Sequence, residues 1–364
     1  MENLSFLFIA IGAILQLFRR SCSAGLRVGI LELLAILTVV AVALASWLDI
    51  FVGPLGDARR YHSTINACAG SMPPCGTKLH EMLWSIFSSV LGPVWALVYG
   101  YTVATALSLI ARTRVLSVHK PILAILFIYS AYQIGNGMAE GTFVLLLLIG
   151  VVALHSKHFI SGALGLFSAF FAHLGNAPFV LYLLRFPRSW PLLALILGLL
   201  LVLIAFLGVV ELNDIYSIVN KAGALASREA TFAAVETKAN VSVQGADTSY
   251  ADILFNMGFP YAPKSLIYSV LLFLAPILAG GDAITFVLGA ISTVMTISTI
   301  WLARKHKTLL LIFALSVIVF GLASFTPGIG LRHKVPLFLF MLMVQHPDSL
   351  RDLLLKNGGY MRRF

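Results

Sequence analysis

The sequence has little charge. Asp, Glu, Lys and Arg make up 11% of its 364 residues, hydrophobic residues make up 59%, and the mean hydropathy is +0.95. A soluble protein of this length needs a larger polar surface, so the composition excludes an ordinary soluble domain. The formal charge of +10 does not indicate nucleic-acid binding, because the Lys and Arg residues occur in short clusters between apolar runs. Basic residues in such places set orientation and contact anionic headgroups.

The sequence also lacks internal repeats, low-complexity tracts and a recognisable soluble domain. Apolar runs of about 20 residues recur instead, and the runs 192–210 and 309–322 are continuous. Because backbone polar groups in lipid must be satisfied within the protein, these runs are predicted to be helices. We therefore predict an all-α, multi-pass membrane protein, in which residues 1–364 form a single transmembrane domain of about 10–11 helices.

Two connections between the predicted helices are long enough to carry function. They are the extramembrane loops 51–82 and 212–264, of which the second is polar. After residues 4–18, which form either a short first span or an interfacial helix, the predicted spans are 28–50, 83–111, 120–137, 141–156, 158–186, 189–211, 265–281, 284–303, 307–324 and 335–347.

Cysteine is scarce, with three residues in the chain. Cys68 and Cys75 flank six residues, a spacing that can close a small disulfide ring in an oxidising compartment. Basic clusters at 19–27 and 112–114 place the loop between them outside the cytoplasm by the positive-inside rule. This location agrees with a disulfide, and two unpaired thiols are the alternative.

The sidedness of the chain after residue 158 has two solutions. If 158–186 crosses the membrane once, the cluster Arg304–Lys307 is cytoplasmic and Arg332–Lys334 lies outside. If 158–186 is a broken hairpin, the later segments invert and Arg185 stays inside. The first solution satisfies the positive-inside rule at Arg304–Lys307. The second fits the slightly acidic loop 212–264, so the sequence leaves both open.

A polar segment in the first long loop is the leading candidate site. It carries Asp57, Arg59, Arg60 and His62 within six residues. One interpretation is a solvated ion pair between the acid and an arginine. The other is that the carboxylate deprotonates or orients an acceptor hydroxyl while the neighbouring Arg and His contact a phosphate. The density of charge in so short a segment favours the second interpretation.

A second candidate is the interruption of the predicted span 158–186. His173 is followed by Gly175-Asn176-Ala177-Pro178, which cannot continue as a regular helix because proline removes a donor and restricts the residue before it. A broken helix at membrane depth is tolerated where it is buried in protein or lines a wet cavity. His173 and Asn176 are therefore expected to point into a cavity, although a structural His bonded to a carbonyl is equally consistent.

The third candidate is the segment 326–336, which is predicted to be a flexible, Gly-rich turn between two spans. It carries Arg332, His333 and Lys334, which serve either as an ordinary headgroup anchor or as a diphosphate clamp, since guanidinium matches phosphate oxygens in a bidentate fork. Arg304–Lys307 has no Gly or Pro around it and is interpreted as a plain anchor. Arg228, in the loop 212–264, could cover a substrate groove.

These features together resemble a family. The motif Gly-Asp-Ala-Arg-Arg-Tyr-His at 56–62, the Phe-Phe-Ala-His at 170–173 followed by a break, and the Arg-His-Lys-Val-Pro at 332–336 are similar to those of Wzy-type and EpsG-like polysaccharide polymerases. These belong to the lipid-carrier-dependent, GT-C-like glycosyltransferases. The resemblance implies an enzyme of O-antigen or exopolysaccharide synthesis that transfers a glycan from polyprenyl diphosphate to an acceptor glycan at the outer face of the cytoplasmic membrane.

The resemblance gives the candidate residues roles. Asp57, His62 and His173 would be catalytic. The residues expected to bind donor or acceptor are Arg59, Arg60, Tyr61, Asn176, Arg228, Arg332, His333 and Lys334. The expected partners are the lipid bilayer, the lipid-linked donor, the glycan acceptor and other polysaccharide-assembly membrane proteins. No cofactor is expected. Monosaccharide transferases similar to this family commonly carry an Asp-Glu pair in the first external loop, whereas here Asp57 is followed by Ala58, so no metal centre is expected either.

The alternative function is a transporter or flippase for an anionic or lipid-linked solute. Broken helices and basic turns would serve a carrier equally well, because half-helix ends and Arg residues also guide transported anions. The absence of an inverted repeat and the location of most charges in loops favour the enzyme.

Overall fold

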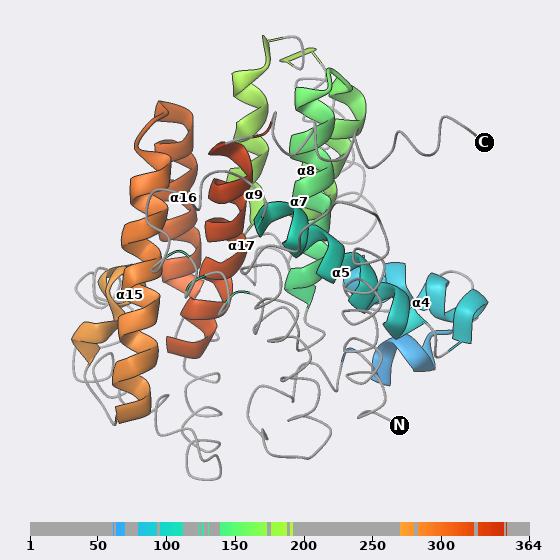
Figure 1. Ribbon diagram of the computed structural model, residues 1–364, viewed down its shortest axis with the longest axis horizontal. Coiled ribbons are helices and arrows are strands. Elements are labelled where there is room, and N and C mark those ends of the chain that lie inside the picture. Colours follow the sequence, from blue (N-terminus) through green and yellow to red (C-terminus); the bar gives the residue numbers. More distant parts are fainter. Residues whose placement is uncertain are drawn as a thin grey trace, which may run out of the picture. The chain divides into compact units, whose positions relative to one another are not determined.

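Figure 1 shows the computed structural model of the chain. The residues that it describes are 61, 63–69, 79–92, 95–111, 123, 126, 130, 139–172, 176–187, 190, 191, 270–279, 283–323, 327–345 and 347. Regular structure within these ranges is helical, with no strand among them, which confirms the predicted all-α class. The chain divides into two compact units, one made of Met1–Val180 with Val335–Phe364 and the other of Leu181–Lys334.

The first unit contains α4 (Leu79–Leu91) and α5 (Trp95–Ala111). The prediction of one continuous span over 83–111 is therefore wrong. Gly92 has a φ of 57°, a left-handed conformation that glycine adopts without strain and that commonly ends helices. Pro93 follows and has no N–H to donate to a continuing helix, so α4 ends and a new helix begins.

The helices α7 (Ala139–His155) and α8 (Phe159–Ala172) pack against each other in the first unit. α7 confirms the helix predicted at 141–156, with a start two residues earlier. A Cβ atom built on Gly165 would lie 2.8 Å from the Cα of Gly150. Glycine on both helices therefore lets the two backbones approach closely, as small residues do where helices pack tightly.

The predicted segment 158–186 is interrupted, because α8 ends at Ala172 and α9 (Ala177–Val180) begins five residues later. Pro178 stands in the first turn of α9, where a missing N–H removes no intrahelical bond. The ring of Phe179 packs against Phe340, with centroids 4.9 Å apart. This contact holds α9 against the part of the C-terminal helix that belongs to the first unit.

The second unit contains two long helices and two 3-10 turns. They are η4 (Leu181–Arg185), η7 (Pro276–Ala279), α15 (Ala283–Ala303) and α16 (Lys307–Ala323). The two long helices confirm the predictions at 284–303 and 307–324. The helix predicted at 265–281 is wrong in its described part, because 270–274 are helical, Ala275 is not, and Pro276 begins a 3-10 turn.

The last described helix is α17 (Pro327–Gln345). The prediction of a flexible turn over 326–336 is wrong, because its glycines and basic residues from position 327 onward are helical. Pro327 occupies the first helical position, where proline is well tolerated. Pro336 is accommodated inside the helix, although it has no N–H to donate to the carbonyl of Arg332.

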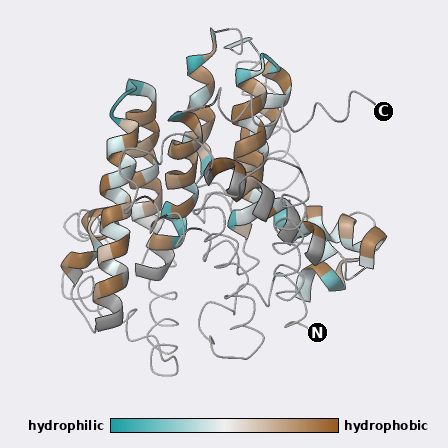
Figure 2. Cartoon of the chain, in the orientation of Figure 1, coloured by the Kyte–Doolittle hydropathy of each residue, from teal (hydrophilic) through white to brown (hydrophobic). Residues whose placement is uncertain are grey.

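The helices α8, α15 and α16 contain many hydrophobic residues, which are brown in Figure 2. Within the ranges that the structure describes, no helix is at once long and apolar enough to cross a bilayer.

Candidate functional site

The structure describes some of the residues singled out in the sequence and not others. Outside the described residues lie Asp57, Arg59, Arg60, His62, Cys75, His173 and Arg228. Described are Tyr61, Cys68, Asn176, Arg332, His333 and Lys334. Cys68 is disulfide-bonded, and its pairing with Cys75 stays a prediction.

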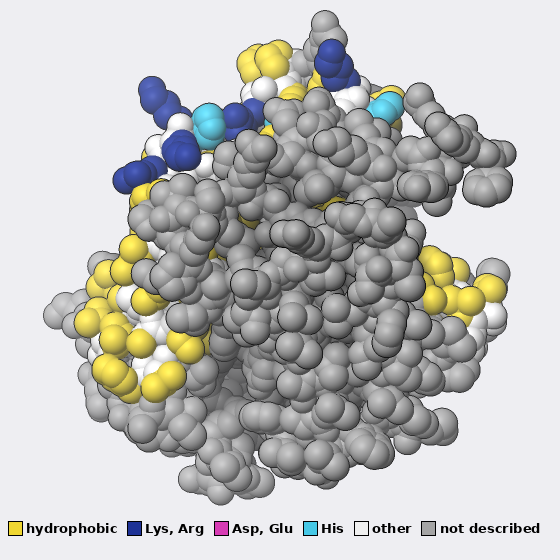
Figure 3. All heavy atoms as spheres, viewed as in Figure 1, with side chains coloured by type: hydrophobic (Ala, Val, Ile, Leu, Met, Phe, Trp, Pro, Cys, Tyr) yellow, Lys and Arg dark blue, Asp and Glu magenta, His cyan; other side chains and the backbone are white. Residues whose placement is uncertain are grey.

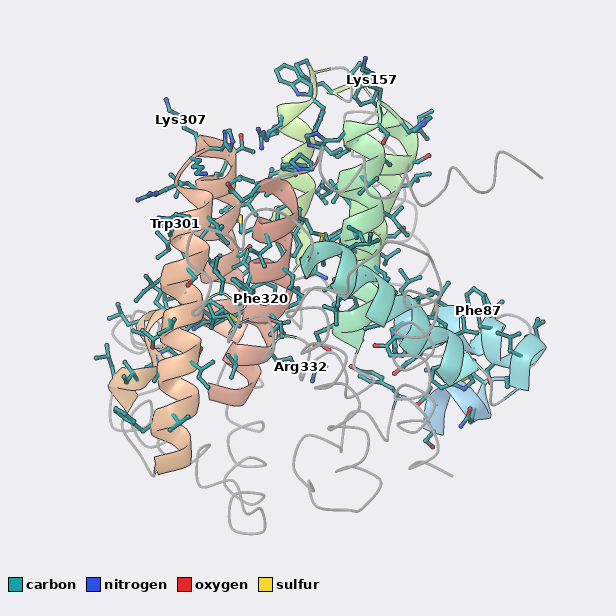
Figure 4. All side chains as sticks on the ribbon, viewed as in Figure 1. Phe87, Lys157, Trp301, Lys307, Phe320 and Arg332 are labelled. Atoms are coloured by element: carbon teal, nitrogen blue, oxygen red, sulfur yellow. The ribbon has the colours of Figure 1, made fainter. Side chains whose placement is uncertain are left out.

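The helix α4 buries polar side chains and exposes apolar ones, which is the inverse of a surface helix in a soluble protein. Its buried side chains are mostly polar: His80, Glu81, Trp84, Ser85 and Ser88. Its exposed large side chains are apolar: Met82, Ile86, Phe87 and Val90. Val90 is 80% exposed, whereas the polar face repeats at helical spacing and is at most 5% exposed. Figure 4 labels Phe87 on this exposed face. α4 therefore presents polar groups to the interior of the first unit.

The polar face of α4 meets a hydroxyl on α7. Thr142 Oγ1 lies 2.8 Å from His80 Nδ1 and accepts a hydrogen bond from Trp84 Nε1 at 2.9 Å. All three side chains are at most 4% exposed. A threonine hydroxyl has one donor and two acceptor lone pairs, so it can satisfy both partners at once. This single oxygen joins α4 to α7.

Aromatic and acidic side chains surround His80. Its ring makes edge contacts with the rings of Tyr61 and Tyr99, at centroid distances of 5.1 and 5.9 Å. Glu140, in the first turn of α7, and Tyr61 both lie within electrostatic reach of Tyr99. We name these residues the His80 cluster: Tyr61, His80, Trp84, Tyr99, Glu140 and Thr142. A carboxylate, an imidazole and two phenols thus meet where water is excluded, the setting in which polar groups interact most strongly.

Tyr61 connects this cluster to the candidate loop. Its side chain is fully buried, although the sequence predicted a residue that contacts substrate. Asp57 precedes it by four residues, and four residues span at most about 14 Å of extended chain. The carboxylate residue Asp57, the predicted general base, is therefore tethered within that distance of the Tyr61 backbone.

Replacing Thr142 by valine should destabilise the first unit. Valine keeps the shape of the side chain but leaves Trp84 Nε1 and His80 Nδ1 without their common partner, at a cost of about 2–4 kcal/mol. Thr142→Ser, which keeps the oxygen, is the matched control. Thermal unfolding of the purified protein in detergent measures both variants, and equal stability of the valine and serine proteins would contradict the role of the hydroxyl.

A second polar cluster lies in the second unit. Lys334 is 3% exposed, and its ammonium group donates to Ser292 Oγ at 2.8 Å and to the Ser292 carbonyl at 3.4 Å. The same nitrogen lies 4.8 Å from the ring centroid of Phe273. No Asp or Glu occurs among the described residues of the second unit. A hydroxyl, a carbonyl and an aromatic face are thus the described groups that contact the buried nitrogen of Lys334.

Two further aromatic contacts fix the position of Lys334. His333 stacks on Phe320 at a centroid distance of 4.7 Å and an interplanar angle of 14°. Phe320 in turn packs on Phe273, 6.4 Å away. We name this group the Lys334 cluster: Phe273, Ser292, Phe320, His333 and Lys334. Arg332 is half-buried beside it, so two of the three predicted phosphate ligands are oriented by the contacts of α15 and α16.

Ser292 and Lys334 should show a stability coupling. Ser292→Ala removes the nearest acceptor of a buried ammonium and should cost about 1.5–3 kcal/mol. Lys334→Met removes the charge and should be nearly neutral, as replacements of buried ions by apolar residues often are. In the Lys334→Met protein the serine substitution should therefore cost much less. A double-mutant cycle measured by unfolding in detergent gives the coupling, and additive costs would show that the pair does not interact.

Asn176 has a local structural partner. Its side-chain amide is buried and donates to the carbonyl of Ala169 at 2.9 Å. This carbonyl lies in the last turn of α8, where backbone acceptors lack helical donors. The observed bond caps α8, and the predicted contact with substrate stays a prediction.

Sequence reasoning missed His80, Glu140, Thr142 and Ser292. A signal existed for the first two. His80 belongs to a run of polar residues at helical spacing, and Glu140 is an acid at the start of an apolar run. Among the described residues no three His, Cys, Asp or Glu side chains are grouped so as to hold a metal ion.

Both clusters are made of residues from different helices, and neither corresponds to a sequence motif that identifies a reaction. Comparison of the chain with protein-family models, with curated proteins and with solved structures found no match.

Proposed function

We propose that the chain is a polytopic, GT-C-like glycosyltransferase of the cytoplasmic membrane, which joins glycan units from a polyprenyl diphosphate donor to an acceptor glycan. The observation that carries this proposal is the inversion of α4. A helix that buries His80 and Glu81 while exposing Ile86 and Phe87 suits a protein with lipid outside and a polar site inside.

Other helices support a lipid-facing surface. Ile160 and Leu164 of α8 are 65% and 56% exposed, and Phe286 and Ile297 of α15 are 51% and 61% exposed. Large exposed apolar side chains that recur along a helix in this way favour contact with a membrane or a partner.

A contact within the second unit bears on which side of the membrane its basic residues are predicted to lie. Both solutions from the sequence put Arg185 and Arg304–Lys307 on opposite sides of the membrane. The packing of η4 against α16, with Arg185 within electrostatic reach of His306, supports instead a topology in which both groups lie on one side. An even number of crossings must then separate them. The interrupted segment at 270–279 is the best candidate for a predicted span that enters the membrane without crossing it.

The chemistry of the proposed transfer suits the candidate residues. The anomeric C–O bond to the diphosphate breaks, its electron pair leaves with the diphosphate, and the acceptor oxygen bonds to the anomeric carbon. Asp57 would take the proton of the acceptor hydroxyl, and Arg59, Arg60 and Arg332 would neutralise the departing charge. The enzyme mainly has to hold two membrane-tethered reactants in line.

Transport of an anionic or lipid-linked solute is the second candidate. The burial of Lys334 and Glu140 favours it more than the sequence did, because ionisable groups inside apolar helical proteins often mark solute or proton pathways. An enzyme and a carrier nevertheless behave differently in detergent, where no closed compartment exists. An enzyme can still lengthen the glycan there, whereas a carrier leaves its substrate unchanged.

Purified protein in detergent, supplied with a lipid-linked oligosaccharide, tests the proposal. We expect longer glycans on the lipid carrier, resolved by gel electrophoresis and mass spectrometry. Detergent leaves no closed compartment, so a carrier would return the substrate unchanged. Unchanged glycan with several donor structures, together with uptake of the same donor into proteoliposomes, would replace the enzyme with the carrier.

A further inference from the structure

Basic side chains from two separate segments of the second unit meet at one of its ends. Arg304, Lys305, His306 and Lys307 form the turn between α15 and α16. Arg185 closes η4, which packs against α16, and lies within electrostatic reach of His306. We name these five residues the basic rim. Figure 3 shows dark-blue and cyan side chains gathered over this end of α15 and α16, and Figure 4 labels Lys307 there.

The basic rim has no acidic partner in the described part of its unit, where neither Asp nor Glu occurs. Its four turn residues are exposed. In a typical solvated surface, charges of both signs are interspersed and offset one another. The described part of this end therefore presents exposed side chains of one sign of charge.

The rim is held in place by its neighbours. The guanidinium carbon of Arg304 and the ammonium of Lys305 lie 5.2 and 5.9 Å from the centroid of the Trp301 ring. The Arg185 guanidinium lies 5.5 Å from the ring of Tyr182. The backbone N–H of His306 donates to Ala303 at 3.1 Å and closes the turn. Ordering the charges in this way lowers the conformational entropy lost on binding.

An apolar collar identifies the kind of partner. Directly along the two helices from the rim, Ile297 and Ile300 on α15 and Leu310 and Leu311 on α16 are exposed. Nucleic acid or an acidic protein would contact the charges and leave these side chains in water. A lipid leaflet contacts both, with acyl chains on the collar and headgroups on the rim, and an aromatic residue such as Trp301 is common at that boundary.

We propose that the basic rim binds the phosphate headgroups of anionic phospholipids and so fixes this end of the second unit at an anionic membrane surface. The inference does not depend on glycan transfer, because a transporter or a membrane-associated scaffold would use the same surface.

The rim also makes lipid binding sensitive to pH. Although His306 is exposed, its pKa is lowered by a limited loss of hydration at the turn and by the positive charges of Arg185 and Lys305. Arg304 and Lys307 flank it on either side with the same sign of charge. Without lipid the imidazole is therefore mostly neutral near pH 7. A bound phosphate reverses the local potential and favours protonation, so affinity should rise as the pH falls from 7.5 to 5.5.

Fluorescent phosphatidylglycerol and phosphatidylcholine, added to the protein in neutral detergent, test the proposal. Phosphatidylglycerol should bind more tightly. The triple variant Arg304→Gln, Lys305→Gln, Lys307→Gln should lose roughly 100-fold in affinity for it, since each basic residue near a membrane surface contributes about fivefold. Acidification to pH 5.5 should strengthen binding about fivefold in the wild type and not in His306→Gln.

Lys157→Asn is the matched control, because it removes one exposed charge at a turn of the first unit where φ is 65°, a conformation that asparagine tolerates. It should bind like the wild type. Equal affinity for both lipids, or full affinity in a triple variant that unfolds at the wild-type temperature, would overturn the proposal. Displacement of the lipid by millimolar inorganic phosphate would also overturn it, because a site for free phosphate needs no leaflet.

Discussion

Asp57→Asn should reduce glycan elongation by roughly 10²–10⁴-fold, the usual contribution of a general base. Asparagine has nearly the same size and can still accept a hydrogen bond, but it cannot take the proton of an acceptor hydroxyl. The purified variant, incubated with lipid-linked oligosaccharide, would be scored by glycan length. Asp57 lies four residues before the fully buried Tyr61 of the His80 cluster. Because asparagine is so similar in size to aspartate, the substitution should leave this cluster and the unfolding temperature unchanged.

Two comparisons make this result interpretable. Lys157→Asn removes a charge from the exposed turn between α7 and α8 and should elongate glycans at the wild-type rate. Asp57→Glu keeps a carboxylate on a longer side chain and should retain part of the activity. Wild-type glycan lengths from Asp57→Asn would show that the acid is a solvated loop residue and that the base lies elsewhere, with Glu140 of the His80 cluster as the next residue to replace.

Gly165→Val should destabilise the protein by about 3 kcal/mol or more. A Cβ atom at this position would lie 2.8 Å from both the Cα and the backbone nitrogen of Gly150, and 3.1 Å from the carbonyl oxygen of Leu146. Backbone atoms of α7 cannot rotate away as a side chain can. The two helices must therefore separate, and contacts along the whole pair are lost. The expected result is a large fall in the unfolding temperature in detergent and a low yield of folded protein.

A graded series tests this explanation. A Cβ on Gly150 would meet the side chain of Leu166 at 3.0 Å, which can change rotamer, and the backbone oxygen of Gly162 only at 3.2 Å, so Gly150→Ala should cost less than Gly165→Val. Leu164 is 56% exposed on the same helix, and Leu164→Ala should cost least. Equal unfolding temperatures for Gly165→Val and Leu164→Ala would mean that close approach of the backbones does not hold this pair together.

The long apolar helices could be predicted from sequence because each is a continuous run with clear ends. α15 and α16 agree with the prediction to within one residue at each end, since the basic turn between them is the only polar interruption. The break between α4 and α5 is hard to predict because Gly92-Pro93 lies inside a long apolar run, which by itself favours one continuous span. The start of α17 was missed for the opposite reason, because glycines suggested a turn where packing holds a helix.

The candidate sites were harder to predict because their members are far apart in the chain. His80 and Thr142 are 62 residues apart, and Ser292 and Lys334 are 42 residues apart. No local pattern contains such pairs, and only the packing of whole helices brings them together. Two of the predicted residues that are described take part in these clusters: Tyr61 contacts His80, and Lys334 contacts Ser292. Sequence thus identified part of each cluster without its partners.

The inverted surface of α4 determines how this region could be engineered. In an aqueous analogue, Met82, Ile86, Phe87 and Val90 would have to become charged residues, because they alone on this helix combine large size, apolar character and exposure. The histidine, acid and serine side chains on the opposite side could remain, since they are buried and would not meet the new solvent. Replacing only these exposed apolar side chains would therefore keep the buried polar residues in a form suited to crystallisation or solution spectroscopy.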